Sequence, residues 1–157
     1  MKILVLSDSH GNLTNMERAF ALEQPDVVFH LGDGAGDFVR LCRGSAQFAA
    51  ACGVAGNCDF GADCPTVRTA EYGGYRFFLT HGHQYQVKYS LMRLYYAARE
   101  ALADVALFGH THVPCCQQEG GLWLLNPGTI SGRPQATYGL IELQNGTLHC
   151  AVRRLED

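Results

Sequence analysis

Five of the seven histidines in this 157-residue chain lie in three short motifs that could bind metal. The motifs occupy residues 8–10 (Asp-Ser-His), 81–83 (His-Gly-His) and 109–112 (Gly-His-Thr-His), and each follows an apolar run typical of a strand. Asp33 and Asn57 also follow apolar runs, each directly after a glycine. Imidazole, carboxylate and amide ligands without thiolate favour Mn, Fe, Zn, Co or Ni, and their number exceeds the needs of one ion. The sequence therefore predicts a site for two ions.

The elements that must position these residues alternate in the first third of the chain. Apolar runs at 2–7 and 26–31 flank a plausible helix at 14–23, which predicts parallel strands joined by a crossover. A short helix at 37–42 and an apolar stretch at 48–55 continue the alternation. This part of the chain is therefore predicted to be α/β.

From residue 67 the pattern changes. Runs at 67–72 and 75–80 flank two glycines, which predicts a hairpin. A long helix is expected at 86–102, because five residues recur at the spacing that forms one buried helix face. These residues are Leu91, Leu94, Tyr95, Ala98 and Leu102.

The last third is expected to form a β meander. Its predicted strands cover 104–108, 122–125, 138–143 and 147–153, the last two paired across Asn145-Gly146. We therefore predict one α/β domain over residues 1–157, a two-sheet β-sandwich flanked by helices in four layers, α/β/β/α. Loops at the carboxyl ends of its strands are expected to converge on one crevice.

The motifs together resemble the calcineurin-like metallophosphoesterase superfamily. They are, in order, Asp8-x-His10, Gly32-Asp33, Gly56-Asn57, His81-Gly82-His83 and Gly109-His110-x-His112. The similarity covers nearly the whole chain, and the short length resembles the small single-domain bacterial and archaeal phosphodiesterases. The resemblance implies a metal-dependent phosphodiesterase that uses two ions and a bridging hydroxide as nucleophile.

Carried over position by position, the resemblance implies two sets of ligands that share one bridging carboxylate, Asp33. The first ion would be bound by Asp8, His10 and His112, and the second by Asn57, His81 and His110. A shared carboxylate suits a pair of cations that acidifies the water between them. Mn or Ni is the cofactor we favour, with Fe, Zn, Co and Mg as alternatives.

The chain departs from the family pattern after Asn57. Many members have histidine where this chain has Cys58, so the usual acid for the leaving group is missing. A thiol is a poor hydrogen-bond donor, and Cys58 either fills space or replaces that acid weakly. Small members with this substitution remain active on phosphodiesters, so the loss need not mean inactivity, but the missing acid implies slow turnover and a preference for good leaving groups. Asp59 is expected to orient a neighbouring histidine, and the candidate catalytic residues are Asp33, Asn57, His81, Cys58 and Asp59.

Other polar residues have simpler interpretations. His149 and, provisionally, His30 are assigned to structure, although His30 could support a ligand, while His83 is expected to contact substrate or support a ligand. Asp37 suits the first turn of a helix and Asp63 a polar loop, so both are kept outside the site. Tyr95 and Tyr96 are expected to lie in the core or in an interface. Arg133 follows a motif turn, but its position in the sequence does not establish a contact with phosphate.

Composition narrows the class of protein. The net charge of -3 and the absence of Lys or Arg runs argue against stable binding to nucleic acid or an anionic membrane. Seven cysteines without a CxxC pair argue against a disulfide framework or structural zinc, and most are expected to be small buried apolar side chains. The apolar N-terminus is too short for a signal peptide or spanning helix. We expect a cytoplasmic protein with a small phosphodiester substrate, and a homo-oligomer is possible.

Two alternative functions remain open. One is a non-catalytic scaffold that resembles the metallophosphoesterase-like retromer subunit, although that scaffold lacks some motif histidines that are present here. The other is a phosphomonoesterase or protein phosphatase, which the missing histidine at position 58 makes less favourable.

Overall fold

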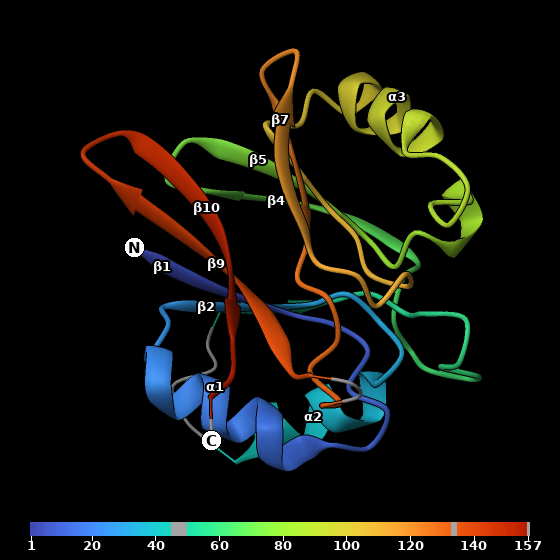
Figure 1. Ribbon diagram of the computed structural model, residues 1–157, viewed down its shortest axis with the longest axis vertical. Helices are drawn as coiled ribbons and strands as arrows, with labels where there is room; N and C mark the ends of the chain where they lie inside the picture. Colours follow the sequence, from blue (N-terminus) through green and yellow to red (C-terminus); the bar gives the residue numbers. More distant parts are fainter. Residues whose placement is uncertain (45–49, 133–134, 157) are drawn as a thin grey trace.

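The computed structural model describes residues 1–44, 50–132 and 135–156, and it contains two five-stranded sheets packed face to face (Figure 1). The first sheet has the order β10 (Thr147–Arg154), β9 (Thr137–Gln144), β1 (Lys2–Leu6), β2 (Val27–His30), β3 (Ala51–Gly53). The second has the order β4 (Val67–Tyr72), β5 (Tyr75–Thr80), β6 (Val105–Leu107), β8 (Leu122–Asn126), β7 (Cys115–Glu119).

Helices cover the outer faces of both sheets (Figure 1). Helices α1 (Leu13–Glu23) and α2 (Ala35–Arg43) lie on the first sheet, and α3 (Met92–Glu100) lies on the second. The strands β1, β2 and β3 are parallel, with Val5 opposite Phe29. These observations confirm the predicted α/β class and the four layers of helix, sheet, sheet and helix.

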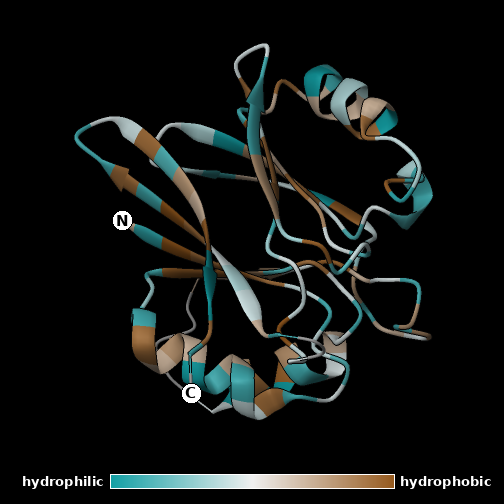
Figure 2. Ribbon diagram, viewed as in Figure 1, coloured by the Kyte–Doolittle hydropathy of each residue, from teal (hydrophilic) through white to brown (hydrophobic). Residues whose placement is uncertain are grey.

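Three apolar clusters hold the layers together, and apolar residues run through the strands of both sheets (Figure 2). Between the sheets, side chains of β1 and β2 such as Phe29 meet those of β5 and β6 such as Phe77. On the outer faces, Met16 of α1 and Leu94 of α3 each pack onto their own sheet. Each sheet therefore buries both faces, which keeps the strand ends in fixed positions.

The predicted helix at 86–102 is wrong in its length. Gln86 adopts the left-handed conformation (φ 56°) after the short 3₁₀ turn η1 (His83–Tyr85), and the α-helix begins only at Met92. The Ser90 hydroxyl accepts the Met92 N–H at 3.1 Å, so the first turn starts there. Leu94 and Ala98 are buried as predicted, whereas Leu102 is 74% exposed.

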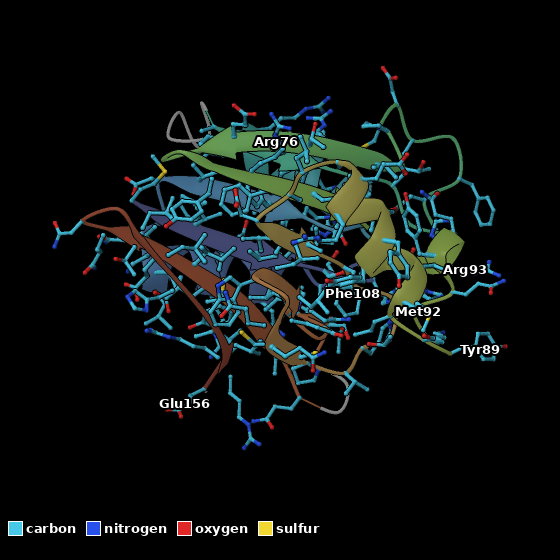
Figure 3. All side chains as sticks on the ribbon, turned by 90° about the horizontal axis from the view of Figure 1, so that it is seen from above. Arg76, Tyr89, Met92, Arg93, Phe108 and Glu156 are labelled. Carbon is cyan, nitrogen blue, oxygen red and sulfur yellow. The ribbon has the colours of Figure 1, made fainter. Side chains whose placement is uncertain are left out.

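The outer face of α3 and the turn before it point to solvent. Seen from above, Tyr89, Met92 and Arg93 point away from the sheets, while Phe108 points inward (Figure 3). Tyr96 is exposed as well and Tyr95 is half-buried, so only Tyr95 fits the expected place in the core.

The predicted meander is also wrong, because the last third of the chain divides between the two sheets. Strand β7 was not predicted, and its hairpin with β8 places β8 between β6 and β7 in the second sheet. The following hairpin, β9 and β10, joins the first sheet beside β1. The pairing of β9 with β10 across Asn145-Gly146 is as predicted.

The cysteines are less buried than expected. All seven are free thiols, five half-buried and two, Cys58 and Cys116, exposed. Within the described parts of the chain, no helix is long and apolar enough to cross a membrane.

A buried carboxylate ties α1 to the edge of the first sheet. Glu23 accepts a hydrogen bond from the Tyr138 hydroxyl at 2.7 Å, and Lys2 and Arg153 lie 3.3 and 3.2 Å from its oxygens. Burial alone would raise the pKa of Glu23, but its hydrogen bonds and the two cations outweigh this and lower it.

We expect Glu23→Ala to lower the free energy of unfolding by about 1–3 kcal/mol, because the buried Tyr138 hydroxyl loses its acceptor. Since the folded pKa of Glu23 is lowered, its ionic contribution is present above the unfolded pKa and is lost as pH falls through the folded pKa. Denaturant unfolding at pH 7 and pH 3 measures both effects, with exposed Glu17→Ala on the same helix as control. Equal stability of both variants would contradict the expectation.

Candidate metal centre

All seven predicted metal ligands follow the carboxyl ends of strands. Asp8 and His10 come after β1, Asp33 after β2, Asn57 after β3, His81 after β5, and His110 and His112 after β6. These strands belong to both sheets, and the loops that follow them gather on one side of the molecule (Figure 1). The sandwich therefore brings together residues that are up to 104 positions apart, from Asp8 to His112.

Asp8, His10 and His112 form the first group. Nε2 of His112 lies 3.0 Å from Oδ1 of Asp8 and 3.3 Å from Nε2 of His10. Nε2 of His10 lies 3.9 Å from the same Asp8 oxygen. One atom from each residue lies within 4.8 Å of the others, which suits ligands of a single ion.

Asp33, His81 and His110 form the second group, again with ligand atoms within 4.8 Å of one another. Nε2 of His81 lies 3.4 Å from Oδ2 of Asp33 and 3.1 Å from Oδ1 of Asn57. Nδ1 of His81 is 2.8 Å from the carbonyl oxygen of Leu31, and because a carbonyl only accepts, Nδ1 must carry the proton. In the neutral ring the lone pair of Nε2 is then free to bind a cation, and a bound cation would take the place of a proton there.

Asp33 lies between the two groups. Its carboxylate belongs to the second group and also lies within 4.8 Å of ligand atoms of His10 and Cys58. The two groups approach each other elsewhere too, since Nε2 of His81 is 4.0 Å from Oδ1 of Asp8. A carboxylate in this place is positioned to be shared by ions bound at the two groups.

The donors fit a cation chemically. Oδ1 of Asp8 is buried and has no hydrogen-bond partner among the described residues, although Nε2 of His112 is near it. A buried carboxylate oxygen without a partner is costly, and a cation between these groups would remove that cost. The residues present therefore fit a divalent metal.

Neighbouring charges shift the pKa values of the second group. Burial alone would raise the pKa of Asp33, yet hydrogen bonds with His81 and Cys58 hold it well below its usual range. Burial, helped by the charges of His81 and Lys88, lowers the pKa of His110 to about 4. For His81, burial opposes protonation, but the hydrogen bond to Asp33 and the carboxylate of Asp8 raise the pKa. Asp33 is thus ionised and His110 neutral at pH 7, the forms that bind metal.

Backbone strain is concentrated at the ligands. Five of them adopt positive φ angles: Asp8 (55°), His10 (45°), Asp33 (54°), His110 (69°) and His112 (59°). Such conformations cost about 1–3 kcal/mol each and persist only where the surrounding structure enforces them. These strained conformations lower the stability of the fold, and they orient the ligand side chains toward one point.

Two glycines make the close approach of these loops possible. A Cβ on Gly56 would lie 2.5 Å from the backbone nitrogen of Asp33, and one on Gly109 would lie 2.7 Å from Oδ2 of Asp8. Neither position has room for another residue without displacing a predicted ligand.

Asp59 does not orient a histidine, which corrects the prediction. Its carboxylate instead accepts four backbone N–H groups at 2.7–2.9 Å, which belong to Asp33, Gly34, Ala35 and Gly56. These bonds fix the loop after β2 against the loop after β3. Asp59 therefore supports the position of Asp33 through the backbone.

Two supporting residues were missed by sequence reasoning. Asp37 lies in the first turn of α2 as predicted, but its buried carboxylate also accepts the Ser9 hydroxyl at 2.6 Å and the Gly11 N–H at 2.8 Å. The Thr129 hydroxyl donates to the carbonyl of Asp8 at 2.8 Å. No sequence pattern pointed to either contact, because both join segments that are far apart in the chain.

The remaining histidines divide as follows. His30 is fully buried, stacks on Phe38 and accepts the Gly32 N–H at Nδ1, and burial lowers its pKa to about 4. His83 packs against the rings of His81 and His110, so it adjoins the second group. His149 lies on β10, far along the chain from the motifs, and Arg133 lies outside the described residues.

Cys58 is exposed beside Asp33. Its backbone N–H donates to Oδ1 of Asp33 at 2.8 Å, and the Asn57 side chain lies 3.4 Å from its sulfur. Contact with the Asp33 carboxylate raises the pKa of the Cys58 thiol. The thiol is therefore protonated at neutral pH and is a weaker acid than an ordinary cysteine.

Comparisons with known proteins agree with the family resemblance of the motifs. Residues 1–146 match the calcineurin-like phosphoesterase superfamily domain. The chain is 32% identical to the probable metallophosphoesterase YsnB of Bacillus subtilis, over 92% of this chain and 86% of that protein. It is also 32% identical to phosphodiesterase YfcE of Escherichia coli, over 90% and 88% respectively. The structure of vacuolar protein sorting 29 from Cryptosporidium parvum has a TM-score of 0.77 at 19% identity, covering 99% and 98%, which shows the shared fold.

Proposed function

Because the chain belongs to the calcineurin-like phosphoesterase superfamily, we propose that it is a phosphodiesterase whose seven motif ligands hold two divalent cations. The observation that carries this proposal is the position of Asp33 between two groups of ligands, each compact enough for one ion. Mn or Ni is the proposed cofactor, and the seven nitrogen and oxygen donors suit either metal.

The chain's own residues have separable roles in this proposal. A bound pair of cations would supply the bridging hydroxide nucleophile and neutralise charge on the phosphate. Asp33, whose carboxylate is ionised, would be shared by the two ions, while Asn57 would add a neutral oxygen and so leave net positive charge for an anionic ester. His81 is held by Leu31, and Asp59 and Asp37 fix the loops that carry Asp33 and His10.

The proposal predicts a preference for diesters over monoesters. With Mn added, hydrolysis of bis-p-nitrophenyl phosphate is expected to exceed that of p-nitrophenyl phosphate in kcat/KM, by roughly tenfold or more. The physical reason is that a monoester dianion demands more help for its leaving group, and this chain has a thiol where many relatives have imidazole. A higher kcat/KM for the monoester would favour the phosphomonoesterase instead.

Cys58 is expected to contribute little to diester hydrolysis. Since its thiol is a weak acid, Cys58→Ala should lower kcat for bis-p-nitrophenyl phosphate less than about fivefold. Cys58→His should increase activity on substrates with poor leaving groups, because imidazolium is the better donor. A loss in Cys58→Ala as large as that in Asp33→Ala would make the thiol catalytic.

A second candidate is a binding scaffold that does not need catalysis, which the fold shared with vacuolar protein sorting 29 leaves open. Complete sets of converging ligands argue for the enzyme, because a scaffold has no need to retain buried, strained carboxylates. Hydrolysis of bis-p-nitrophenyl phosphate by metal-loaded protein distinguishes the two.

A further inference from the structure

A hollow of about 720 Å³ adjoins the metal centre on the side of Cys58. Its walls come from α2, β3 and the loop at 58–64. Cys58 belongs to both places, because its sulfur lies within 4.8 Å of ligand atoms of His10 and Asp33. A group attached to a phosphorus at the metal centre can therefore extend into this hollow.

Two phenylalanine rings line the hollow, one exposed and one buried. Phe60, two residues after Cys58, is 93% exposed. Phe38 also lines it, and its ring stacks on His30 at 5.2 Å with an angle of 17° between the planes. An exposed aromatic ring beside a ligand cavity is a surface on which a planar ring can stack.

Three cations also line the hollow: Arg40, Arg43 and Arg68. Among the described residues, none of them has a hydrogen-bond or ion-pair partner. Asp59 lines the same wall, but its oxygens are already occupied by four backbone N–H groups, which leaves Asp63 as the other nearby acid. In a chain of net charge -3, this grouping of unpaired guanidinium groups favours an anionic ligand.

The base of the hollow contains an unused hydrogen-bond donor. Nδ1 of His30 accepts the Gly32 N–H, so the ring proton lies on Nε2, which is buried and has no partner among the described residues. A buried donor without an acceptor costs free energy. An acceptor on a bound ring, reached directly or through one water, would remove that cost.

The hollow on the opposite side of the metal centre has a different character. It continues from His10 and His112 past Asn12 and Ser131 to Arg18, and among the described residues its lining contains no Phe, Tyr or Trp. The side chains of Asn12 and Arg18 already donate to backbone carbonyls. Planar apolar groups are therefore favoured only on the Cys58 side.

We propose that the hollow on the Cys58 side binds the nucleotide part of a phosphodiester substrate, with its base on Phe60 and a phosphate at the arginines. The role in catalysis rests on the proposed function, whereas binding of a nucleotide does not. The substrate class is then a phosphodiester with a nucleotide on its leaving-group side, next to Cys58.

Calorimetric titration of the full chain with AMP and with ribose 5-phosphate tests this proposal. It is done on manganese-loaded protein and on chelator-treated protein, where phosphate cannot bind through metal. In both states AMP should bind roughly tenfold more tightly than ribose 5-phosphate, because only AMP has a base to stack. Phe60→Ala should remove this difference, and Arg40→Ala combined with Arg43→Ala should weaken AMP binding by about tenfold.

Matched controls are Tyr89→Ala, an equally exposed aromatic residue that does not line the hollow, and Arg18→Ala in the opposite hollow. Both variants should bind AMP with an affinity within about twofold of that of the original chain. The proposal is overturned if the chain binds AMP and ribose 5-phosphate with equal affinity. It is also overturned if the chain self-associates and Phe60→Ala abolishes this self-association. If AMP binds as expected but bis-p-nitrophenyl phosphate is not hydrolysed, the nucleotide site stands and the phosphodiesterase assignment fails.

Discussion

Asp33→Ala is expected to lower kcat for bis-p-nitrophenyl phosphate by roughly a thousandfold or more. The Asp33 carboxylate belongs to the second ligand group and also lies within 4.8 Å of His10, so its loss removes the one side chain that both ions would share. The same change should reduce bound Mn from about two equivalents per chain to one or fewer. Steady-state kinetics and elemental analysis measure the two effects.

The structure offers a matched control for this substitution. Glu119 is an exposed carboxylate on the edge strand β7, and Glu119→Ala should leave both turnover and metal content nearly unchanged. Because Asp33 also accepts the Cys58 N–H, the thermal melting temperature of Asp33→Ala must be compared with that of the original chain. A folded Asp33→Ala protein with more than a tenth of the original activity would contradict the proposed role.

Removal of metal is expected to abolish hydrolysis and to lower stability. Chelator-treated protein should retain less than about a thousandth of its activity, since the proposed nucleophile is a hydroxide that the two ions would hold. Without a cation, Oδ1 of Asp8 remains buried and unpartnered, so addition of Mn or Ni should raise the melting temperature as well as restore turnover.

Calorimetry and activity assays on the same samples test this expectation. Ligand binding at a hundredfold excess over its dissociation constant adds about 2.7 kcal/mol to the free energy of unfolding, a shift that is easily measured. Mg and Zn should be compared with Mn and Ni, because the ligand set by itself does not select one metal. Full activity in protein that has been shown by elemental analysis to be free of metal would refute the proposed chemistry.

The sequence predicts most of the fold because its strongest patterns reflect burial. The aliphatic runs of β1 and β2 are buried on both faces, and the glycine pair after Tyr72 leads directly into β5. Strand β7 was missed because it is an edge strand with four exposed residues, so no alternation of apolar and polar residues marks it. The helix at 86–102 was overextended because the Gln86 backbone turns left-handed, which periodicity alone does not reveal.

The candidate site, like the fold, could be predicted only in part. Motif residues could be named in advance because their type and order are distinctive. Six of the seven predicted ligands lie in the two groups, and the seventh, Asn57, contacts His81 of the second group. Supporting contacts could not be predicted in this way. The hydrogen bonds that Asp59 accepts from four backbone N–H groups, and that Asp37 accepts from the Ser9 hydroxyl, depend on how separate loops meet. Sequence patterns identify side chains that do chemistry more readily than side chains that hold a backbone in place.

The most direct test of the account is a crystal of this protein soaked in manganese and measured for anomalous scattering. The account predicts two peaks about 3.5–4 Å apart, one beside Asp8, His10 and His112 and one beside Asn57, His81 and His110, with Asp33 in contact with both. A single peak, or two peaks that Asp33 does not join, would contradict it.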